Sequence, residues 1–165
     1  MDMDYDKLAI KKKFSRGNHG SYVYLLEGNI VKKKYPEKFR RFFVKEIQMM
    51  TYLKDCRHVV DLLHADYENL IFYMTFGGKS VSSSPKNLEL VRKTARKLHK
   101  KWGLVRIDPE KGGIVYDIFL PNTGKLSNGQ IMFFDLASDK WHVEPKHPRF
   151  VKYLQTFPAD QAKKI

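Results

Sequence analysis

The sequence predicts an α+β fold in which an antiparallel sheet and one main helix precede a smaller second part. Residues 22–26 and 30–35 are rich in apolar side chains and flank the turn E-G-N, which is the pattern of a β-hairpin. Apolar residues recur every three or four positions over residues 39–53, as in a helix that buries one face. A second helical pattern covers residues 87–102. Antiparallel strands combined with separate helices indicate the α+β class.

The first helix carries an acid on its apolar face. Glu46 lies among phenylalanines, methionines and Ile47 at helical spacing. An unpaired buried carboxylate is costly, so a lysine of the neighbouring strand is the expected partner. Residues 32–34 are all lysines and alternate between the two faces of that strand, so spacing alone does not select one. In the alternative, Glu46 lies at the helix edge and pairs in water with Lys45 or Arg41.

The elements between the two helices follow in order. Residues 53–63 link the first helix to a short strand, and residues 69–78 form a buried strand that ends in Gly-Gly. A polar spacer, residues 79–85, leads to the second helix, whose apolar face is expected to contain Leu88, Val91, Ala95, Leu98 and Trp102. We therefore divide the chain into two parts, residues 1–78 and 79–165.

Three polar residues in the second part have a spacing suited to phosphoryl transfer. Asp117 is followed by Asn122 in the pattern D-x-x-x-x-N, and Asp135 follows a predicted hairpin with the turn S-N-G. Phosphoryl transfer from ATP uses one carboxylate to orient the attacking hydroxyl. A second carboxylate and an amide oxygen hold Mg²⁺ against the phosphates.

This segment resembles the catalytic loop and metal-binding aspartate of protein kinases. Upstream, residues 15–23 (S-R-G-N-H-G-S-Y-V) resemble the glycine-rich loop of the same family, although Ser15 replaces the first glycine. The resemblance implies that Gly17 and Gly20 let the backbone approach the phosphates of ATP. Taken together, the motifs occur in the family's order over about residues 10–140.

The resemblance also implies roles for residues around the nucleotide. Lys33 would pair with Glu46 and hold the phosphates, because this choice places Val31 where the family packs against adenine. With Gly77-Gly78 as the register, Phe72 would be the gatekeeper. The backbone of Tyr73 and of Thr75 would then bind the base. Asn122 and Asp135 would hold Mg²⁺, and Asp117, Lys33 and Glu46 would be the catalytic residues.

What the resemblance implies overall is a reduced protein-kinase-like fold, with an antiparallel-sheet N-lobe and a truncated, mostly helical C-lobe. It is similar to mini-kinases that bacteria secrete into host cells and to kinase-like proteins of large DNA viruses. The expected activity is that of a Mg-ATP-dependent Ser/Thr protein kinase. Because the chain after Asp135 is short, a partner protein is expected to supply activation or substrate docking.

Several positions depart from the family pattern. Val115-Tyr116 replaces the usual His-Arg, Leu136-Ala137 replaces Phe-Gly after the aspartate, and residues 105–113 are an additional stretch. Phe119 stands where Ser/Thr kinases have a lysine that touches the γ-phosphate, which affects turnover more than nucleotide binding. A pseudokinase that binds and modulates a host kinase or regulator therefore remains an alternative.

Composition adds a second signal. The net charge is +13, so the surface is expected to attract an acidic protein or nucleic acid, and a basic nucleic-acid-binding module is the second alternative. The single cysteine, Cys56, excludes an internal disulfide framework. No apolar run predicts a signal peptide or a membrane span, so we expect an intracellular protein in the cytoplasm, or in a host cytoplasm or nucleus if it is viral or secreted.

Overall fold

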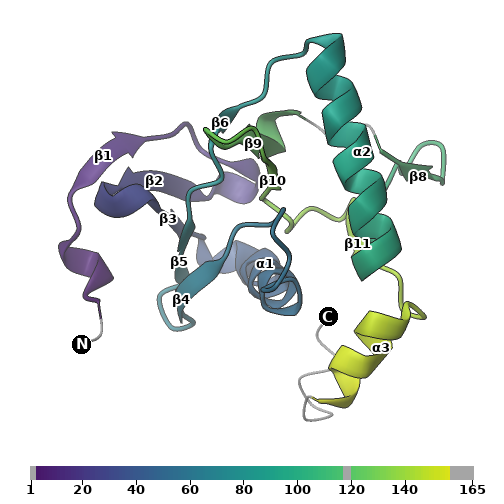
Figure 1. Ribbon diagram of the computed structural model, residues 1–165. Coiled ribbons are helices and arrows are strands. Elements are labelled where there is room, and N and C mark those ends of the chain that lie inside the picture. Colours follow the sequence, from purple (N-terminus) through teal and green to yellow (C-terminus); the bar gives the residue numbers. More distant parts are fainter. Residues whose placement is uncertain (1–2, 117–119, 157–165) are drawn as a thin grey trace.

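Antiparallel pairing builds the largest sheet of the protein, which lies at one side of the molecule in Figure 1. The computed structural model describes residues 3–116 and 120–156. The sheet has the strand order β1-β2-β3-β5-β4. Its strands are β1 (Ile10–Lys13), β2 (Tyr22–Leu26), β3 (Ile30–Lys34), β4 (Leu62–Asp66) and β5 (Ile71–Thr75). The predicted hairpin is present, and Gly28 has a φ of 74° in its turn, a conformation that glycine adopts without steric cost.

Helix α1 (Arg40–Tyr52) lies between two hydrophobic clusters. Phe42, Phe43 and Ile47 pack against the large sheet, whereas Met49 and Tyr52 pack toward the second part of the chain. The predicted helix is therefore correct, and it buries residues on both sides. This double burial fixes the rotation of α1 and so the direction in which Glu46 points.

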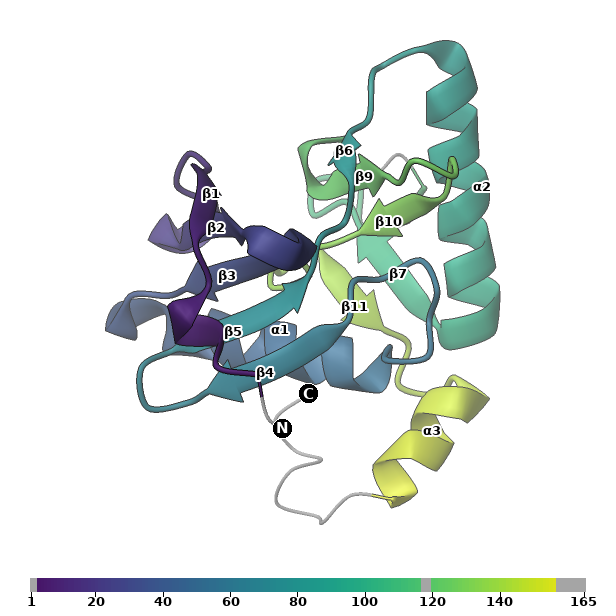
Figure 2. The ribbon, with the colours of Figure 1, turned by 60° about the vertical axis from the view of Figure 1, so that its left-hand side comes forward.

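In its described residues, 79–116 and 120–156, the second part contains two α-helices and two three-stranded sheets, which lie together in Figure 2. Helix α2 (Pro85–Trp102) begins after Ser84, whose side chain accepts a hydrogen bond from the Asn87 amide at 3.3 Å, and helix α3 (Pro148–Gln155) follows near the end of the described chain. The sheets have the orders β10-β9-β6 and β11-β7-β8. Their strands are β6 (Lys79–Ser80), β7 (Leu104–Ile107), β8 (Ile114–Val115), β9 (Thr123–Lys125), β10 (Ile131–Phe133) and β11 (Trp141–Val143).

These strands make the second part less helical than the sequence predicted. The additional stretch, residues 105–113, contains most of β7 and the turn that leads to β8. Strand β11 adds to β7 through the pairs Trp141↔Arg106 and Val143↔Leu104. The pairing joins residues that are distant in the sequence, so no local pattern indicates it. The coarser prediction of an α+β protein with an antiparallel sheet is confirmed.

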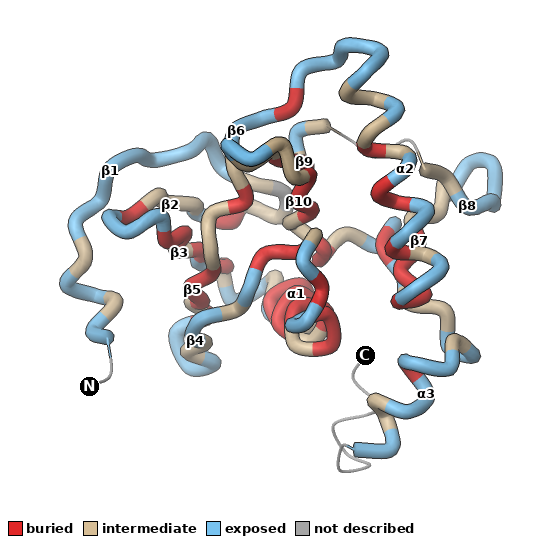
Figure 3. Tube along the Cα trace, in the orientation of Figure 1, coloured by how far each residue is buried: buried red, intermediate tan, exposed pale blue. Residues whose placement is uncertain are grey.

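Helix α2 has one buried and one exposed face, as Figure 3 shows by colour. Its buried residues are Val91, Thr94, Ala95, Leu98 and Trp102. The helix ends at Gly103, which has a φ of 70°. Within residues 3–116 and 120–156, no helix is long and apolar enough to span a membrane.

Candidate functional site

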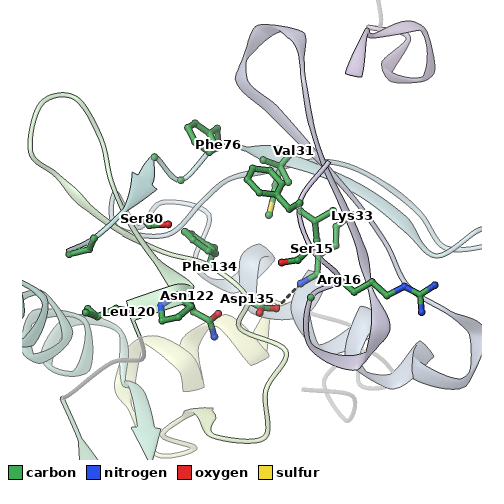
Figure 4. Close-up of a pocket in the computed structure, with 18 residues that line it drawn as sticks. Ser15, Arg16, Val31, Lys33, Phe76, Ser80, Leu120, Asn122, Phe134 and Asp135 are labelled. Carbon is green, nitrogen blue, oxygen red and sulfur yellow. Dashed lines mark hydrogen bonds and ion pairs between the residues drawn. The ribbon is translucent and has the colours of Figure 1, made fainter. Parts of the chain in front are cut away.

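A cavity of about 560 Å³ lies between the large sheet and the β9–β10 hairpin (Figure 4). This volume is within the range of small-molecule sites. Its walls come from four segments of the chain. They are the loop after β1 (Phe14 to Gly17), strands β2 and β3 (Val23, Val31, Lys33), the segment from β5 to β6 (Met74, Phe76, Gly77, Gly78, Ser80, Val81), and residues around β9 and β10 (Leu120, Pro121, Asn122, Phe134, Asp135).

Lys33 is the buried cation of this cavity. Its Nζ lies 2.8 Å from Glu46 Oε2, 3.1 Å from Glu46 Oε1 and 2.6 Å from Asp135 Oδ1. The side chains of Lys33 and Glu46 are only 3% and 1% exposed. Of the three candidate lysines, Lys33 thus has the buried partner, whereas Lys32 pairs with Asp6 and Lys34 is exposed. The expected pairing of Glu46 with Lys33, and not with Lys45 or Arg41, is present.

The neighbouring carboxylates hold the Lys33 ammonium in its charged form. Burial by itself lowers the pKa of Lys33, but the carboxylates of Glu46 and Asp135 outweigh it, and the pKa lies well above the usual lysine value. Burial raises the pKa of Glu46, and the nearby ammonium of Lys33 opposes that effect. The Lys33 ammonium is therefore charged at neutral pH and faces the cavity beside Asp135 (Figure 4).

Tyr35 completes the cluster, and the sequence reasoning missed it. Its hydroxyl donates a hydrogen bond to Glu46 Oε2, and its ring is 2% exposed. Burial raises the pKa of Tyr35, so the hydroxyl stays protonated. Tyr35 follows Lys33 by two residues, and residues at that spacing in a strand share a face, which is the signal that could have identified it.

Of the predicted glycine-rich loop, residues 15–17 and Val23 line the cavity, and Gly20 does not. Gly17 lines the cavity, and its backbone N–H donates to the Ser21 carbonyl at 3.0 Å. A Cβ on Gly17 would lie 2.6 Å from Ser21 Oγ, so the loop closes tightly at that point. Gly20 instead lies against Pro36, and His19 stacks on Phe42 with ring centroids 3.5 Å apart.

Strand β5 contributes to the cavity through different residues than the resemblance implied. Val31 lines the cavity as expected, and its partner across the β3–β5 ladder, Met74, lines it too. Phe72 is fully buried behind Lys33, with Lys33 Nζ 6.0 Å from the centre of its ring. Tyr73 and Thr75 are absent from the cavity wall.

The backbone groups of Tyr73 and Thr75 take part in pairing at the sheet. Tyr73 pairs with both β3 and β4, and the Thr75 amide donates to the Asp61 carbonyl at 3.0 Å. Since a central strand pairs on both sides, its backbone groups are not open to a ligand. The chain leaves the sheet only after Thr75, and in this segment Met74, Phe76 and the two glycines line the cavity. The assignment of base-binding backbone to Tyr73 and Thr75 is corrected accordingly, because neither residue belongs to the cavity wall.

Close backbone contact joins this wall to the β9–β10 hairpin. A Cβ on Gly124 would lie 2.0 Å from the Gly77 carbonyl oxygen, and a Cβ on Gly78 would lie 2.4 Å from the Lys125 carbonyl oxygen. Gly78 also has a φ of 90°, which side chains rarely tolerate. Three glycines thus allow the two parts of the chain to meet at the edge of the cavity.

The metal-binding residues proposed from the sequence line one side of the cavity. Asn122 and Asp135 both contribute to the lining, and the Phe134 amide donates to the Asn122 carbonyl at 3.3 Å. Asp135 has a φ of 61°, an uncommon conformation that recurs at functional sites. Asp117 and Phe119 lie outside the described residues. Among the described residues, no three His, Cys, Asp or Glu side chains gather as a metal site.

The residue before Asp117 is held by a polar cluster. The Tyr116 hydroxyl lies 2.8 Å from Nδ1 of His99 on α2, and Nε2 of the same ring lies 2.9 Å from Glu144 Oε1. The resemblance places Tyr116 at the position of an arginine in protein kinases. The contacts with His99, which the sequence did not indicate, hold the chain at Tyr116.

The chain matches no protein-family model and no curated protein. We therefore infer the function of the cavity from the chemistry of its own side chains.

Proposed function

We propose that this chain is a reduced, protein-kinase-like phosphotransferase that binds Mg-ATP in the cavity and transfers a phosphoryl group to a Ser or Thr hydroxyl. The observation that carries the proposal is the buried Lys33 ammonium, held between Glu46 and Asp135 in the cavity wall. A buried cation at the base of a cavity, with a carboxylate beside it, fits a ligand that brings both phosphates and a divalent cation.

The polar groups of the cavity have complementary tasks in this proposal. Lys33 holds phosphate oxygens, and Glu46, supported by Tyr35, keeps the ammonium oriented. Asp135 and Asn122 supply oxygen ligands for Mg²⁺, which would contribute positive charge against the phosphates. Asp135 accepts a hydrogen bond from Lys33. With Mg-ATP bound, a cation on Asp135 and a phosphate on Lys33 would take the place of this contact.

The apolar part of the cavity suits the base. Val23 and Val31 lie on one side of it, and Met74 and Phe76 line the adjoining wall. The Gly17 turn is narrow enough to bring backbone toward phosphates without an intervening side chain. Asp117 would orient the hydroxyl of the substrate, as the D-x-x-x-x-N spacing predicts.

Phosphoryl transfer is measured with radiolabelled ATP, Mg²⁺ and a generic Ser/Thr substrate, with and without cell extract. Asp117→Asn is expected to abolish transfer and leave ATP-dependent stabilisation intact, because its role is toward the hydroxyl. Lys33→Ala is expected to damage both. Transfer by Asp117→Asn at the wild-type rate would contradict the proposed role.

The alternative is a pseudokinase that binds Mg-ATP or a partner without turnover. Phe119, in the place of a lysine that contacts the γ-phosphate in Ser/Thr kinases, favours this alternative. Wild-type protein that binds Mg-ATP but transfers no phosphate, even in cell extract, would support the pseudokinase and exclude the enzyme.

A further inference from the structure

A second concave site lies between α2, the segment after α1 and the turn of the β9–β10 hairpin. We call it the α2 groove. It has a volume of about 540 Å³ and is lined by Arg57, Lys97, Lys101, Asn128, Gly129 and Gln130, among others. It shares no lining residue with the cavity around Lys33. The proposed nucleotide chemistry therefore does not account for it.

The charge of the α2 groove is strongly positive. Arg57, Lys97 and Lys101 are exposed, and none forms an ion pair with a carboxylate of the described residues. Asp55 is the one carboxylate among the described lining residues. Burial lowers the pKa of His58 in the groove wall, and the nearby Arg57 and Lys97 lower it further, as a positive potential requires.

The apolar residues beneath these cations are already covered. Leu98, Ile131 and Trp102 line the groove but are only 3%, 1% and 4% exposed. A docked peptide gains most of its affinity from apolar anchors in pockets, and this groove offers little uncovered apolar surface for one. The Trp102 ring is also buried under Arg149, so it provides no platform for an unpaired base.

The cations form a row that is longer than a single anion. Lys97 and Lys101 are four residues apart on α2 and share a side of the helix, and exposed Lys93 precedes them at the same interval. At 1.5 Å per residue the row extends about 12 Å along the helix. Arg57 stands across the groove from it. A row of this kind suits successive phosphates of one strand.

We propose that the α2 groove binds the phosphate backbone of double-stranded nucleic acid without reading its sequence. The lysines and Arg57 neutralise phosphates, and the side-chain amide of Asn128 borders the same groove and can donate a hydrogen bond to them. The side-chain amide of Gln130 donates to the Arg57 carbonyl and so holds the Arg57 backbone at the groove. This would place the proposed phosphotransferase on nucleic acid while its Lys33 cavity stays open.

The test measures the affinity for a fluorescently labelled DNA duplex by anisotropy between 50 and 200 mM salt. The variant Arg57→Gln/Lys97→Gln/Lys101→Gln removes three charges from the groove. The control Lys11→Gln/Lys12→Gln/Lys13→Gln removes three exposed charges from β1. Three lost phosphate contacts reduce the salt slope by about 2.7, so the wild-type affinity should fall about 40-fold more over this range than that of the groove variant.

The result expected is that the groove variant loses both affinity and salt dependence, whereas the β1 variant stays close to wild type. Equal losses in the two variants would show diffuse attraction and overturn the proposal, as would the absence of duplex binding by wild type at 50 mM salt. If polyglutamate displaces the labelled duplex as effectively as unlabelled duplex does, the groove binds an acidic protein instead, and the proposal is overturned. Stabilisation by Mg-ATP should be the same in all three proteins, which separates this proposal from that for the Lys33 cavity.

Discussion

At the scale of single residues, the centre of the molecule is a buried ion cluster. Lys33, Glu46, Asp135 and the Tyr35 hydroxyl meet at hydrogen-bond distance beneath the sheet. Removing charges from water costs several kcal/mol per ion, and well-packed apolar residues often replace such a pair without loss of stability. The cluster is thus better explained by the chemistry of the cavity than by folding.

Tyr35→Phe tests how much the hydrogen bond from the Tyr35 hydroxyl to Glu46 stabilises the folded protein. The substitution keeps the buried ring and removes the donor to Glu46, leaving a buried carboxylate with one partner fewer. We expect the free energy of unfolding to fall by about 2 kcal/mol, measured by urea denaturation. Tyr22→Phe, at an exposed hydroxyl that contacts Arg16, should change it by less than about 0.5 kcal/mol. Equal small effects would mean that Glu46 does not need Tyr35.

At the scale of elements, the cavity exists because β9 approaches the segment between β5 and β6 without a side chain between them. The pairs Lys79↔Lys125 and Ser80↔Gly124 connect β6 to β9. Gly124 lies at the closest point, where its added Cβ would overlap the Gly77 carbonyl. The position of this wall relative to Lys33 follows from that contact.

Gly124→Ala should therefore disturb the cavity as well as the fold. Because the obstructing atom belongs to the backbone, the strands must separate, and we expect a loss of about 1–3 kcal/mol in unfolding free energy together with weaker Mg-ATP binding. Gly113→Ala is the matched control, since nothing lies within 4 Å of its added Cβ. A Gly124→Ala protein that is as stable as the Gly113→Ala protein would contradict the close contact.

The loop between β1 and β2 contains a titratable side chain, His19, that packs against α1. Burial lowers the pKa of His19, which stacks on Phe42 of α1. Above the ordinary histidine pKa of about 6.5, both folded and unfolded states hold a neutral ring. As the pH falls below that value the unfolded chain binds the proton first, so the stability that His19 contributes is lost on the way down to its lower folded pKa.

His19→Phe keeps an aromatic ring on Phe42 and removes the proton. His19 has a φ of 61°, which phenylalanine tolerates less well, so the variant is expected to melt at a lower temperature than the wild type near pH 8. The wild type should nevertheless lose more stability than the variant between pH 7 and pH 5. The comparison requires thermal denaturation of both proteins across that range. Parallel curves would mean that His19 is solvated in the folded state.

Local sequence patterns predicted the main helices and the first hairpin. Pairing between strands that are distant in the sequence could not be predicted from such patterns. The β2–β3 hairpin, α1 and α2 follow from turn chemistry and apolar periodicity. The cost of a buried carboxylate predicted that a strand lysine pairs with Glu46, and the family resemblance selected Lys33. Tyr73 and Thr75 do not line the cavity, because Tyr73 is paired on both sides within the sheet and the Thr75 amide donates to the Asp61 carbonyl. Strand β11 was missed because its partner β7 is distant in the sequence.

At the scale of the whole molecule, both parts of the chain contribute polar side chains to the cavity. The large sheet and α1 hold Lys33 and Glu46, and the β9–β10 region brings Asn122 and Asp135 to the same cavity. The segment after α1 also pairs with β10, since the Phe133 amide donates to the His58 carbonyl at 2.7 Å. The cavity is thus a product of the complete fold, and α2 adds a basic groove outside it.

The most direct test of this account is the melting temperature with and without Mg-ATP. At ten times its dissociation constant, a ligand of the folded state stabilises it by about 1.4 kcal/mol. For a chain of 165 residues this predicts a rise of about 3–6 °C. Asp135→Asn should lose most of the rise, whereas Asp139→Asn, at an exposed carboxylate nearby, should keep it. An unchanged melting temperature of the wild type at millimolar Mg-ATP, or the full rise in Asp135→Asn, would contradict the assignment of the cavity to Mg-ATP.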